Sequence, residues 1–564
     1  SRYLKLPDGE YLNPQSWYCT AVQAAELALP LSLADVGSVL GLERQKMTEG
    51  KELIKYFCVP CKPTKSNGNC TRNRPCHDIN KWETFKKYCM RDVDVERQIA
   101  DKLKMYPISD EEHRLYVLDQ IINDRGVLVD SELAEQAVKL NSIQTAVAVE
   151  QAYMITGLEN PNSVTQLKQW LKEKGVEIES LSKKSVKSLA DETDGDVSEM
   201  LKLRLLMAKT SVKKYEAVIR SVCSDNRVHG MMRFCGANRT GRWSGNILQP
   251  QNLPQNHLPD LTLARDIVKD GDFEMLDMMF GNVPNVLSEL IRTVLIPKPN
   301  HRFIVADFSA IEARVLARIA GEQWRIDTFK NGGDIYCASA SKMFKVPVEK
   351  HGVNGELRQK GKISELACGY GGSVGALKNM GAVEMGVQEN ELQGLINDWR
   401  NANPHIVRFW YEVGNAAMKA IKEKTTVPLG KLVFAYERGI LFIRLPSGRR
   451  LSYIKPRIGT NRFGGDSITY MGINSAKKWD RLETFGGKLT ENIVQGTARD
   501  LLANALINAA NAGYDTVFHV HDEIICEVPN GYGSVDELCK LMCIKPEWAD
   551  GLPLNADGFE CEYY

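Results

Sequence analysis

The pattern of apolar and polar positions divides the chain into helical and strand-rich stretches. Residues 106 to about 220 carry apolar side chains at helical spacing, interrupted at Gly126. From about 222 to 312 the pattern changes to short strands and loops, and it ends in an apolar run at 302–307 that predicts a buried strand. Residues 313 to about 425 are again helical in pattern. Helical and strand-rich stretches in succession predict an α+β protein.

The remaining stretch mixes strands with one long helix. Residues 426–475 predict several strands bounded by turns, and 489–511 predict a helix. The run "TVFHVHDEIICEV" (516–528) predicts a hairpin, with His521 and Asp522 between two apolar strands.

Length and composition limit the class of protein. A chain of 564 residues is too long for one core, so several domains are expected. It begins at Ser1 without a basic and apolar leader, and no apolar run approaches a membrane-spanning length. The 14 Cys are scattered, several of them in apolar runs, which favours reduced thiols. We therefore expect no membrane association and a cytoplasmic location.

The predicted strand at 302–307 ends on a carboxylate, Asp307, and a helical pattern follows at once. One interpretation is structural: Ser309 and Glu312 have the S-x-x-E spacing of a capping box, and Asp307 is then a loop residue. The other is chemical. Asp522 and Glu523 stand at the predicted hairpin turn. Carboxylates from two strands can hold two Mg²⁺ roughly 3.5–4 Å apart for phosphoryl transfer.

A predicted helix in "GELRQKGKISELACGYGG" (355–372) has the chemistry that complements such a site. Its Arg358, Lys362, Leu366 and Tyr370 recur every four residues and so share one face. Cations at one end of this stripe suit phosphates, and the apolar and aromatic residues at the other suit a base. A solvated basic helix end is the alternative.

These motifs together resemble the DNA polymerase I-like family A DNA polymerases, of the bacteriophage or prophage type. "DFSAIEARVLA" resembles motif A, "RQKGKISELACGYGG" motif B and "HVHDEIICEV" motif C. The resemblance implies a right-hand fold, with a helical thumb, an antiparallel palm and helical fingers, preceded by a partial RNase H-like exonuclease domain. It implies DNA-directed DNA polymerase activity on primer–template DNA and dNTPs, with two Mg²⁺ that Mn²⁺ can replace.

The resemblance also implies roles for single residues. The metal ligands are Asp307, Asp522 and the Phe308 carbonyl, and the catalytic set adds Lys362 and Glu523. The nucleotide-binding set is Phe308, Ser309, Ile311, Glu312, Arg358, Lys362, Leu366 and Tyr370. The DNA-binding set is Arg242, Gln251, Asn252, Gln495 and His521. Glu312 is expected to exclude a ribose 2′-OH, and Lys362 to protonate the leaving pyrophosphate.

The domain boundaries follow from the motif positions. We expect a partial and inactive exonuclease-like domain at 1–105, the thumb at 106–221, a first palm segment with motif A at 222–312, fingers with motif B at 313–425, a strand-rich insert and connection at 426–488, and a second palm segment with motif C at 489–564. The insert has no assigned role.

The amino-terminal region resembles only the end of a proofreading domain. Tyr88 and Asp92 have the Y-x-x-x-D spacing of its third motif, and no Asp-x-Glu pair stands before them. We therefore expect no proofreading from this chain. The same region carries cysteines whose leading C-x-x-C could be half of a zinc site, although unrelated thiols are the favoured reading. These cysteines are Cys58, Cys61, Cys70 and Cys76.

Two other functions are compatible with parts of the pattern. A single-subunit RNA polymerase would share the hand, but Glu312 beside the sugar argues against it. A catalytically silent primer–template or zinc-dependent DNA-binding protein would not need both Asp307 and Asp522.

Leu366 and Tyr336 depart from the family pattern, which expects an aromatic residue and a histidine there. We expect a monomer; processivity partners are unknown.

Overall fold

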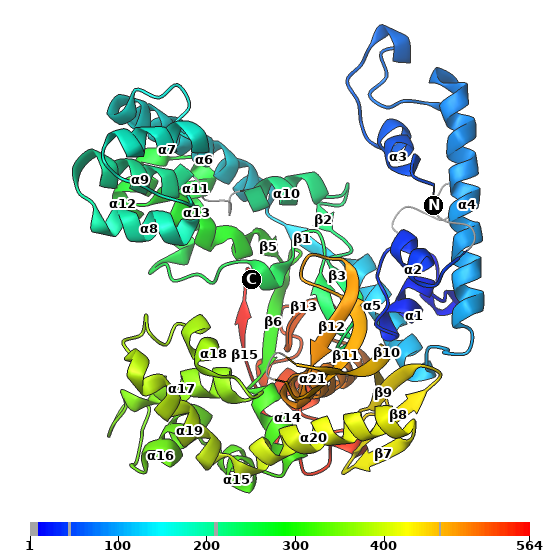
Figure 1. Cartoon of the computed structure of the whole chain (residues 1–564). Helices are drawn as coiled ribbons and strands as arrows, with labels where there is room; N and C mark the ends of the chain where they lie inside the picture. Colours follow the sequence, from blue (N-terminus) through cyan, green and yellow to red (C-terminus); the bar gives the residue numbers. More distant parts are fainter. Residues whose placement is uncertain (1–9, 43–46, 208–212, 462–463) are drawn as a thin grey trace.

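A computed structural model describes residues 10–42, 47–207, 213–461 and 464–564. The amino-terminal region lies along one side of the molecule (Figure 1). In its described residues it is helical, with α1 (Thr20–Glu26), α2 (Leu33–Val39), α3 (Gly50–Cys58) and the long α4 (Ile79–Leu103). Val95 and Ile99 of α4 share a core with Ile440 and Phe442, so this region packs on the strand-rich insert.

A first helical lobe projects from the opposite side (Figure 1). It contains α6 (Ser131–Thr156), α7 (Val164–Glu173), α8 (Lys183–Glu192), α9 (Gly195–Met207) and α10 (Lys213–Ser221). The preceding α5 (Asp110–Arg125) ends at Gly126, whose φ of +61° explains the predicted break. Next to α5, the short strands β1 (Val127–Val129), β2 (Arg227–Val228) and β5 (Leu295–Ile296) form one small sheet.

The prediction of only strands and loops at 222–312 is wrong in part. β3 (Met232–Ala237) and β4 (Arg242–Gly245) are present. However, α11 (Leu261–Asp270), α12 (Phe273–Phe280) and α13 (Val283–Leu290) follow, and they pack on the first helical lobe. Asp260, Asp272 and Asn282 each accept a hydrogen bond from a main-chain N–H three residues on, so each helix begins with a standard cap.

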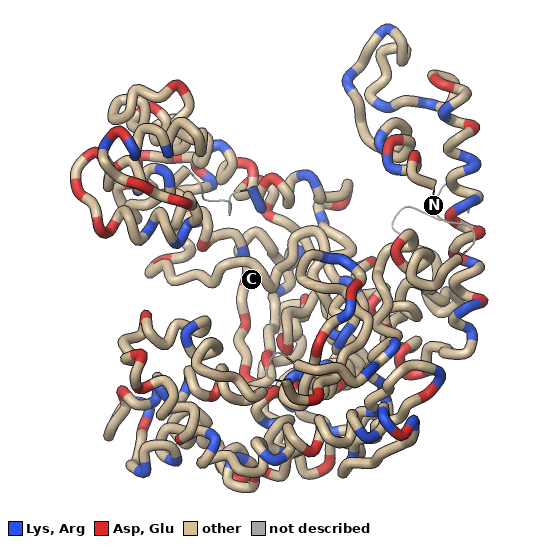
Figure 2. The backbone as a smooth tube through the Cα atoms, in the orientation of Figure 1, with Lys and Arg blue, Asp and Glu red and all other residues tan. Residues whose placement is uncertain are grey.

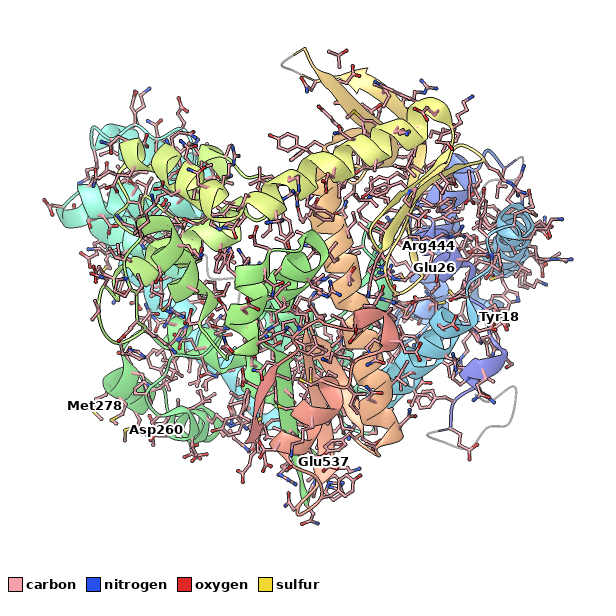
Figure 3. The ribbon with its side chains drawn as sticks, turned by 90° about the horizontal axis from the view of Figure 1, so that it is seen from below. Tyr18, Glu26, Asp260, Met278, Arg444 and Glu537 are labelled. Atoms are coloured by element: carbon pink, nitrogen blue, oxygen red, sulfur yellow. The ribbon has the colours of Figure 1, made fainter. Side chains whose placement is uncertain are left out.

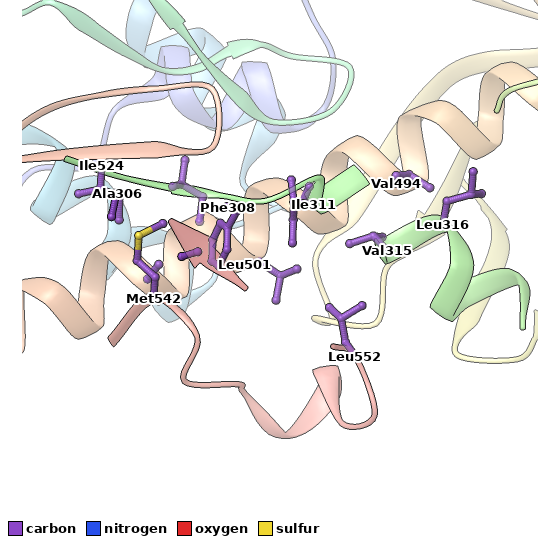
Figure 4. Packing of buried hydrophobic residues seen from close by; sticks show 14 of the residues in the cluster. Ala306, Phe308, Ile311, Val315, Leu316, Val494, Leu501, Ile524, Met542 and Leu552 are labelled. Carbon is purple, nitrogen blue, oxygen red and sulfur yellow. The ribbon is translucent and has the colours of Figure 1, made fainter. Parts of the chain in front are cut away.

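The central sheet brings the two predicted carboxylate segments together. Its strand order is β13 (Thr516–Val520), β14 (Glu523–Pro529), β6 (His301–Phe308) and β15 (Ala556–Cys561), and its strand pairs are antiparallel. Buried apolar side chains of β6 and β14 face α14 (Ile311–Ala320), α21 (Gly486–Asn511) and α22 (Val535–Met542). Figure 4 shows part of this core: Ala306, Phe308, Ile311, Val315, Leu316, Val494, Leu501, Ile524, Met542 and Leu552.

A second helical lobe follows α14 in the chain and faces the first lobe across a gap between the ribbons (Figure 1). It contains α15 (Gln323–Lys330), α16 (Ile335–Phe344), α17 (Leu357–Cys368), α18 (Val374–Asn379), α19 (Leu392–Ala402) and α20 (Pro404–Glu423).

The strand-rich insert is one six-stranded antiparallel sheet. Its strands follow chain order: β7 (Thr426–Leu429), β8 (Leu432–Glu437), β9 (Ile440–Arg444), β10 (Arg450–Thr460), β11 (Asp466–Ile473) and β12 (Trp479–Thr484). One face packs on α20 and on the start of α21 through Phe434, Leu441 and Tyr453. We call this sheet, residues 426–484, the insert sheet.

Candidate active site

Asp307 and Asp522, far apart in the sequence, lie side by side: Asp307 is on β6, and Asp522 is in the turn that leads into the neighbouring β14. Asp307 is opposite Glu523 in the antiparallel register of β6 and β14. The Phe308 N–H donates to the Asp522 main-chain carbonyl at 3.3 Å. His521, with φ of +52°, makes the tight turn that ends β13 and points the chain back. The predicted hairpin is therefore confirmed, and it places three carboxylates at one end of the sheet.

Burial raises the pKa of all three carboxylates. Burial, with Asp522 and Glu523 next in effect, raises the pKa of Asp307 to about 7. Burial also raises the pKa of Asp522, against the opposing effect of Arg242. Two buried carboxylates side by side are unfavourable unless a cation joins them. Carboxylate oxygens are the ligands that hard divalent cations prefer, so the donor set fits the predicted metal site.

Arg242 on β4 lies between the two carboxylate motifs. Its Nη2 is 2.8 Å from Glu312 Oε1 and 3.5 Å from Asp522 Oδ1. Tyr370 donates its hydroxyl hydrogen to Glu312 Oε2 at 2.8 Å. Glu312 is thus held by Arg242, which is predicted to bind DNA, and by Tyr370, which is predicted to bind the nucleotide.

The capping-box interpretation of Ser309 and Glu312 is wrong. The residue before α14 is Ala310, with φ of +50° and no side-chain cap. Ser309 instead donates its hydroxyl hydrogen to Asp557 on β15, and Asn555 donates to the Ser309 hydroxyl at 3.1 Å. The turn between β6 and α14 is therefore held by β15 and the residues before it. No sequence pattern indicates this contact, because Asn555 and Asp557 belong to no recognised motif.

The predicted stripe is present on α17 for Arg358, Lys362 and Leu366, but α17 ends at Cys368, so Tyr370 lies in the turn beyond the helix. The cationic end of the stripe has a partner that the sequence did not identify. Arg358 donates through Nε to Asp334 Oδ2 at 2.9 Å, and its Nη2 lies 2.8 Å from the same oxygen. This contact raises the pKa of Arg358 and helps to lower that of Asp334. Within the described residues Lys362 makes no ion pair, and Leu366 is half exposed. Lys362 and Leu366 are therefore available to a ligand, whereas Arg358 and Tyr370 are already engaged by carboxylates.

A buried ion pair fixes α17 to the rest of its lobe. Glu365, between Lys362 and Leu366, pairs with Arg325 of α15, and both side chains are almost fully buried. Trp399 of α19 donates its indole N–H to Glu365 at 2.9 Å, and Arg325 also donates to Asn403 Oδ1 at 2.9 Å. Sequence reasoning missed this network because a Glu inside a basic helix looks like a surface residue.

The predicted DNA-binding residues are only partly brought together. Arg242, Gln251 and His521 line one small cavity of about 50 Å³ beside Trp243. Gln495 is half-buried on α21. Asn252 is exposed and donates to Gln249. Glu523 accepts a hydrogen bond from the Tyr564 hydroxyl at 2.9 Å, another contact without a sequence signal.

The amino-terminal candidates form no comparable site. Tyr88 is buried on α4 in an aromatic cluster with Phe57 and Phe85. Among the described residues no group of three or more His, Cys, Asp or Glu could hold a metal ion, so zinc at Cys58, Cys61, Cys70 and Cys76 gains no support. Over all the residues that the structure describes, no helix is both long and apolar enough to cross a bilayer.

Comparison with known proteins agrees with this geometry. Residues 131–545 match the model of "DNA polymerase family A". The chain is 52% identical over 556 residues to the DNA polymerase of Bacillus phage SP02, covering 98% of this chain and 86% of that one. It is 27% identical over 265 residues to the thermostable DNA polymerase I of Thermus aquaticus, covering 46% of this chain and 27% of that one.

A solved structure shares the fold. The POL domain of Pol1 from M. smegmatis, in complex with DNA primer-template and dNTP, aligns with a TM-score of 0.58 at 19% identity, over 96% of this chain and 81% of that chain. The fold and the paired carboxylates thus define a right-hand nucleic-acid polymerase. The chain belongs to DNA polymerase family A and is a DNA-directed DNA polymerase.

Proposed function

We propose that this chain adds dNTPs to a primer 3′-OH, as directed by a template, by phosphoryl transfer at two Mg²⁺ ions. The observation that carries the proposal is that Asp307, on β6, and Asp522, in the turn that leads into the adjacent β14, lie side by side near α17, which carries Arg358 and Lys362. Phosphoryl transfer requires mainly positioning and charge neutralisation, and this arrangement offers both.

The carboxylates of Asp307 and Asp522 and the carbonyl of Phe308 would hold the metal ions. The ions, when bound, would activate the 3′-OH and neutralise charge on the phosphates. Holding them also requires Arg242 to give up its 3.5 Å contact with Asp522, since a cation would replace it there.

Side chains of the protein bind and orient the substrates and donate a proton to the leaving group. Arg358 binds the triphosphate once it leaves Asp334, and the Lys362 Nζ donates a proton to the departing pyrophosphate. Leu366 and Tyr370 border the base and sugar, with Ser309 and Ile311 in the turn beneath. Glu312, fixed by Tyr370 and Arg242, occupies the space that a ribose 2′-OH needs. Arg242, Gln251, Asn252, Gln495 and His521 contact the primer–template, and Glu523 lies by the primer terminus.

The lobes take the expected roles in this proposal. The first helical lobe serves as the thumb, the central sheet as the palm and the second helical lobe as the fingers. The amino-terminal region acts without nuclease activity, because Asp92 alone cannot assemble two metal ions. The enzyme works as a monomer in the cytoplasm, on DNA and dNTPs.

Primer extension tests the proposal. The wild-type chain with Mg²⁺ should extend a primer with dNTPs and far less with rNTPs. Asp307→Asn and Asp522→Asn should each abolish extension while duplex binding stays within a few-fold, because both carboxylates serve the metals. A variant that kept more than about a tenth of the wild-type rate would refute the assignment of that residue. Extension with rNTPs alone would indicate an RNA polymerase, and binding without extension a silent binder.

A further inference from the structure

The insert sheet concentrates positive charge in a chain that is otherwise slightly acidic. Residues 426–484 contain eleven Lys and Arg and four Asp and Glu, a net charge of +7, whereas the whole chain carries +1. Figure 2 shows Lys and Arg recurring along these strands. A charge imbalance confined to one element indicates an anionic partner more than a need for solubility, which mixed charges serve equally well.

Most of these cations have no carboxylate partner. In the described part of the chain seven exposed ones make no ion pair: Lys431, Arg438, Arg444, Lys455, Arg457, Lys477 and Lys478. Three of the four carboxylates are already engaged, Glu437 with Arg450, Asp466 with Lys422, and Asp480 with Asn474 and the Arg481 N–H. The positive charge of the sheet is therefore not neutralised within it.

Two local features place like charges close together. Arg444 and Arg450 are directly opposite in the register of β9 and β10, and like charges so placed are unfavourable. Of the two, only Arg450 has a carboxylate partner among the described residues, Glu437. Arg444 lies at the side of the sheet near the amino-terminal helices (Figure 3). On β10 the register shifts between Ile454 and Arg457, and Lys455 has φ of +46°. Bulges of this kind re-aim side chains.

The bulge also adjoins other cationic residues. The Lys455 N–H donates to the Gly439 carbonyl at 2.9 Å, next to Arg438 in the turn between β8 and β9. Arg481 donates to the Lys455 carbonyl at 3.2 Å. Arg438, Lys455, Arg457 and Arg481 thus come from two strands and one turn to a single area, which we call the β10 bulge cluster.

The insert sheet is adjacent to the active site. Asn461 and Ser467, at the far end of β10 and β11, line a cavity of about 330 Å³ together with Gly371, just after α17, and Trp410 and Tyr411 of α20. Tyr411 and the neighbouring Phe485 are both more than half exposed. Exposed aromatic rings near cations suit unpaired bases, which stack on such rings.

We propose that the insert sheet, through the β10 bulge cluster, is a second DNA-binding surface that contacts phosphates of the template strand outside the active site. The proposal rests on the proposed function, in which DNA is the substrate. It assigns a role to the insert sheet, which contains none of motifs A, B and C. The group bound by the cluster is a DNA phosphate. Such phosphates can belong either to the single-stranded template overhang or to the product duplex, and the test below distinguishes the two.

The test measures how binding depends on salt. Two primer–templates share one duplex; one has a long template overhang and the other a single unpaired template nucleotide. The full chain is compared with the variant Arg438→Ser, Lys455→Asn, Arg457→Ser, in which Asn suits the positive φ of residue 455. Fluorescence anisotropy gives Kd at several salt concentrations. Each lost phosphate contact lowers the slope of log Kd against log salt by about 0.7 on single strands and about 0.9 on duplex.

We expect the slope to fall by about 2 on the long overhang and to stay unchanged on the short one. An equal fall on both DNAs would support the surface and assign it to the duplex. An unchanged slope on both DNAs would overturn the proposal without affecting the proposed function, which the extension assay tests separately.

Two controls keep the result interpretable. The variant Lys51→Gln, Lys55→Gln, Lys87→Gln removes three exposed cations from α3 and α4 and should keep the wild-type slope. If the first variant melts well below the wild type, the charge-preserving variant Arg438→Lys, Lys455→Arg, Arg457→Lys replaces it. That variant should retain the full slope, and a loss there would contradict a purely electrostatic contact.

Discussion

At the scale of single residues, the two arginines that we propose to bind substrate are already engaged by carboxylates. Arg358 is bound by Asp334, and Arg242 by Glu312 and Asp522. A nucleotide or a metal ion must therefore displace an existing ion pair rather than enter an empty site. The net gain on binding is the difference between the new contacts and the old ones.

Because Asp334 competes with the nucleotide for Arg358, removing the Asp334 charge should increase the affinity for dNTP. Asp334→Asn should lower the Kd for dNTP several-fold, because Arg358 would no longer be held by a carboxylate. Asn is chosen because it keeps the cap that Asp334 provides to the Tyr336 and Cys337 N–H groups. Pre-steady-state titration of dNTP measures the effect. A raised Kd would mean instead that Asp334 orients Arg358 for the phosphate.

The position of Glu312 predicts a preference for dNTPs over rNTPs. Glu312→Ala should raise the ratio of rNTP to dNTP incorporation by at least about tenfold, since it removes the side chain expected beside the 2′ position. Tyr370→Phe is the matched control: it removes only the hydrogen bond that holds Glu312 and should have a smaller effect in the same direction. Single-nucleotide incorporation assays would measure both, and unchanged selectivity in Glu312→Ala would remove this role.

At the scale of elements, the position of α17 depends on a buried pair. Glu365→Leu leaves the Arg325 charge uncompensated and should destabilise the protein by about 3–5 kcal/mol. The double variant Glu365→Leu, Arg325→Met should recover much of that loss, because no charge remains buried.

The double variant separates two roles of this pair. If it anchors α17 for nucleotide binding, the melting temperature should recover while the KM for dNTP stays raised and kcat changes little. Recovery of both the melting temperature and the KM would show that the pair is only structural. Thermal melts and steady-state extension kinetics on the same preparations give the answer.

The elements also show what the sequence could predict. The strand ending at Asp307, the hairpin at Asp522 and the twelve-residue α17 were predicted because each carries a local periodic pattern. The helices at 261–290 were missed although Asp260 and Asp272 cap them, because each is only 8 or 10 residues long and so repeats its apolar pattern over too few turns to be recognised. Contacts such as Ser309 with Asp557 or Arg325 with Glu365 join distant segments, and no local pattern encodes them.

At the scale of the whole molecule, stability should depend on pH through buried acids. Asp119 on α5 accepts hydrogen bonds from Trp243, Gln120 and Asn123, and burial raises its pKa from 3.8 to about 7. The folded chain thus binds this proton more tightly than the unfolded chain does. Stability should therefore fall as pH rises from about 4 to about 7, by up to about 1.4 kcal/mol per pH unit.

Asp119→Asn tests this dependence. The variant lacks the titrating group, so its stability should fall less between pH 5 and pH 8 than that of the wild type. Some fall should remain, because burial also raises the pKa of Glu26 to about 7. Denaturant unfolding at several pH values gives both curves. Parallel curves would mean that Asp119 is ionised in the folded protein throughout this range.

The strand order β13, β14, β6, β15 has a consequence for the timing of synthesis. Both neighbours of β6 are made more than 200 residues after it, once the second helical lobe and the insert sheet have been translated. A growing chain that has reached residue 510 holds Asp307 on a strand with neither neighbour in its sheet. Closing so long a loop is slow, and it must precede any metal site. The polymerase therefore gains its active site as a late event in folding, and a ribosome that stalls before β14 releases no partly active enzyme.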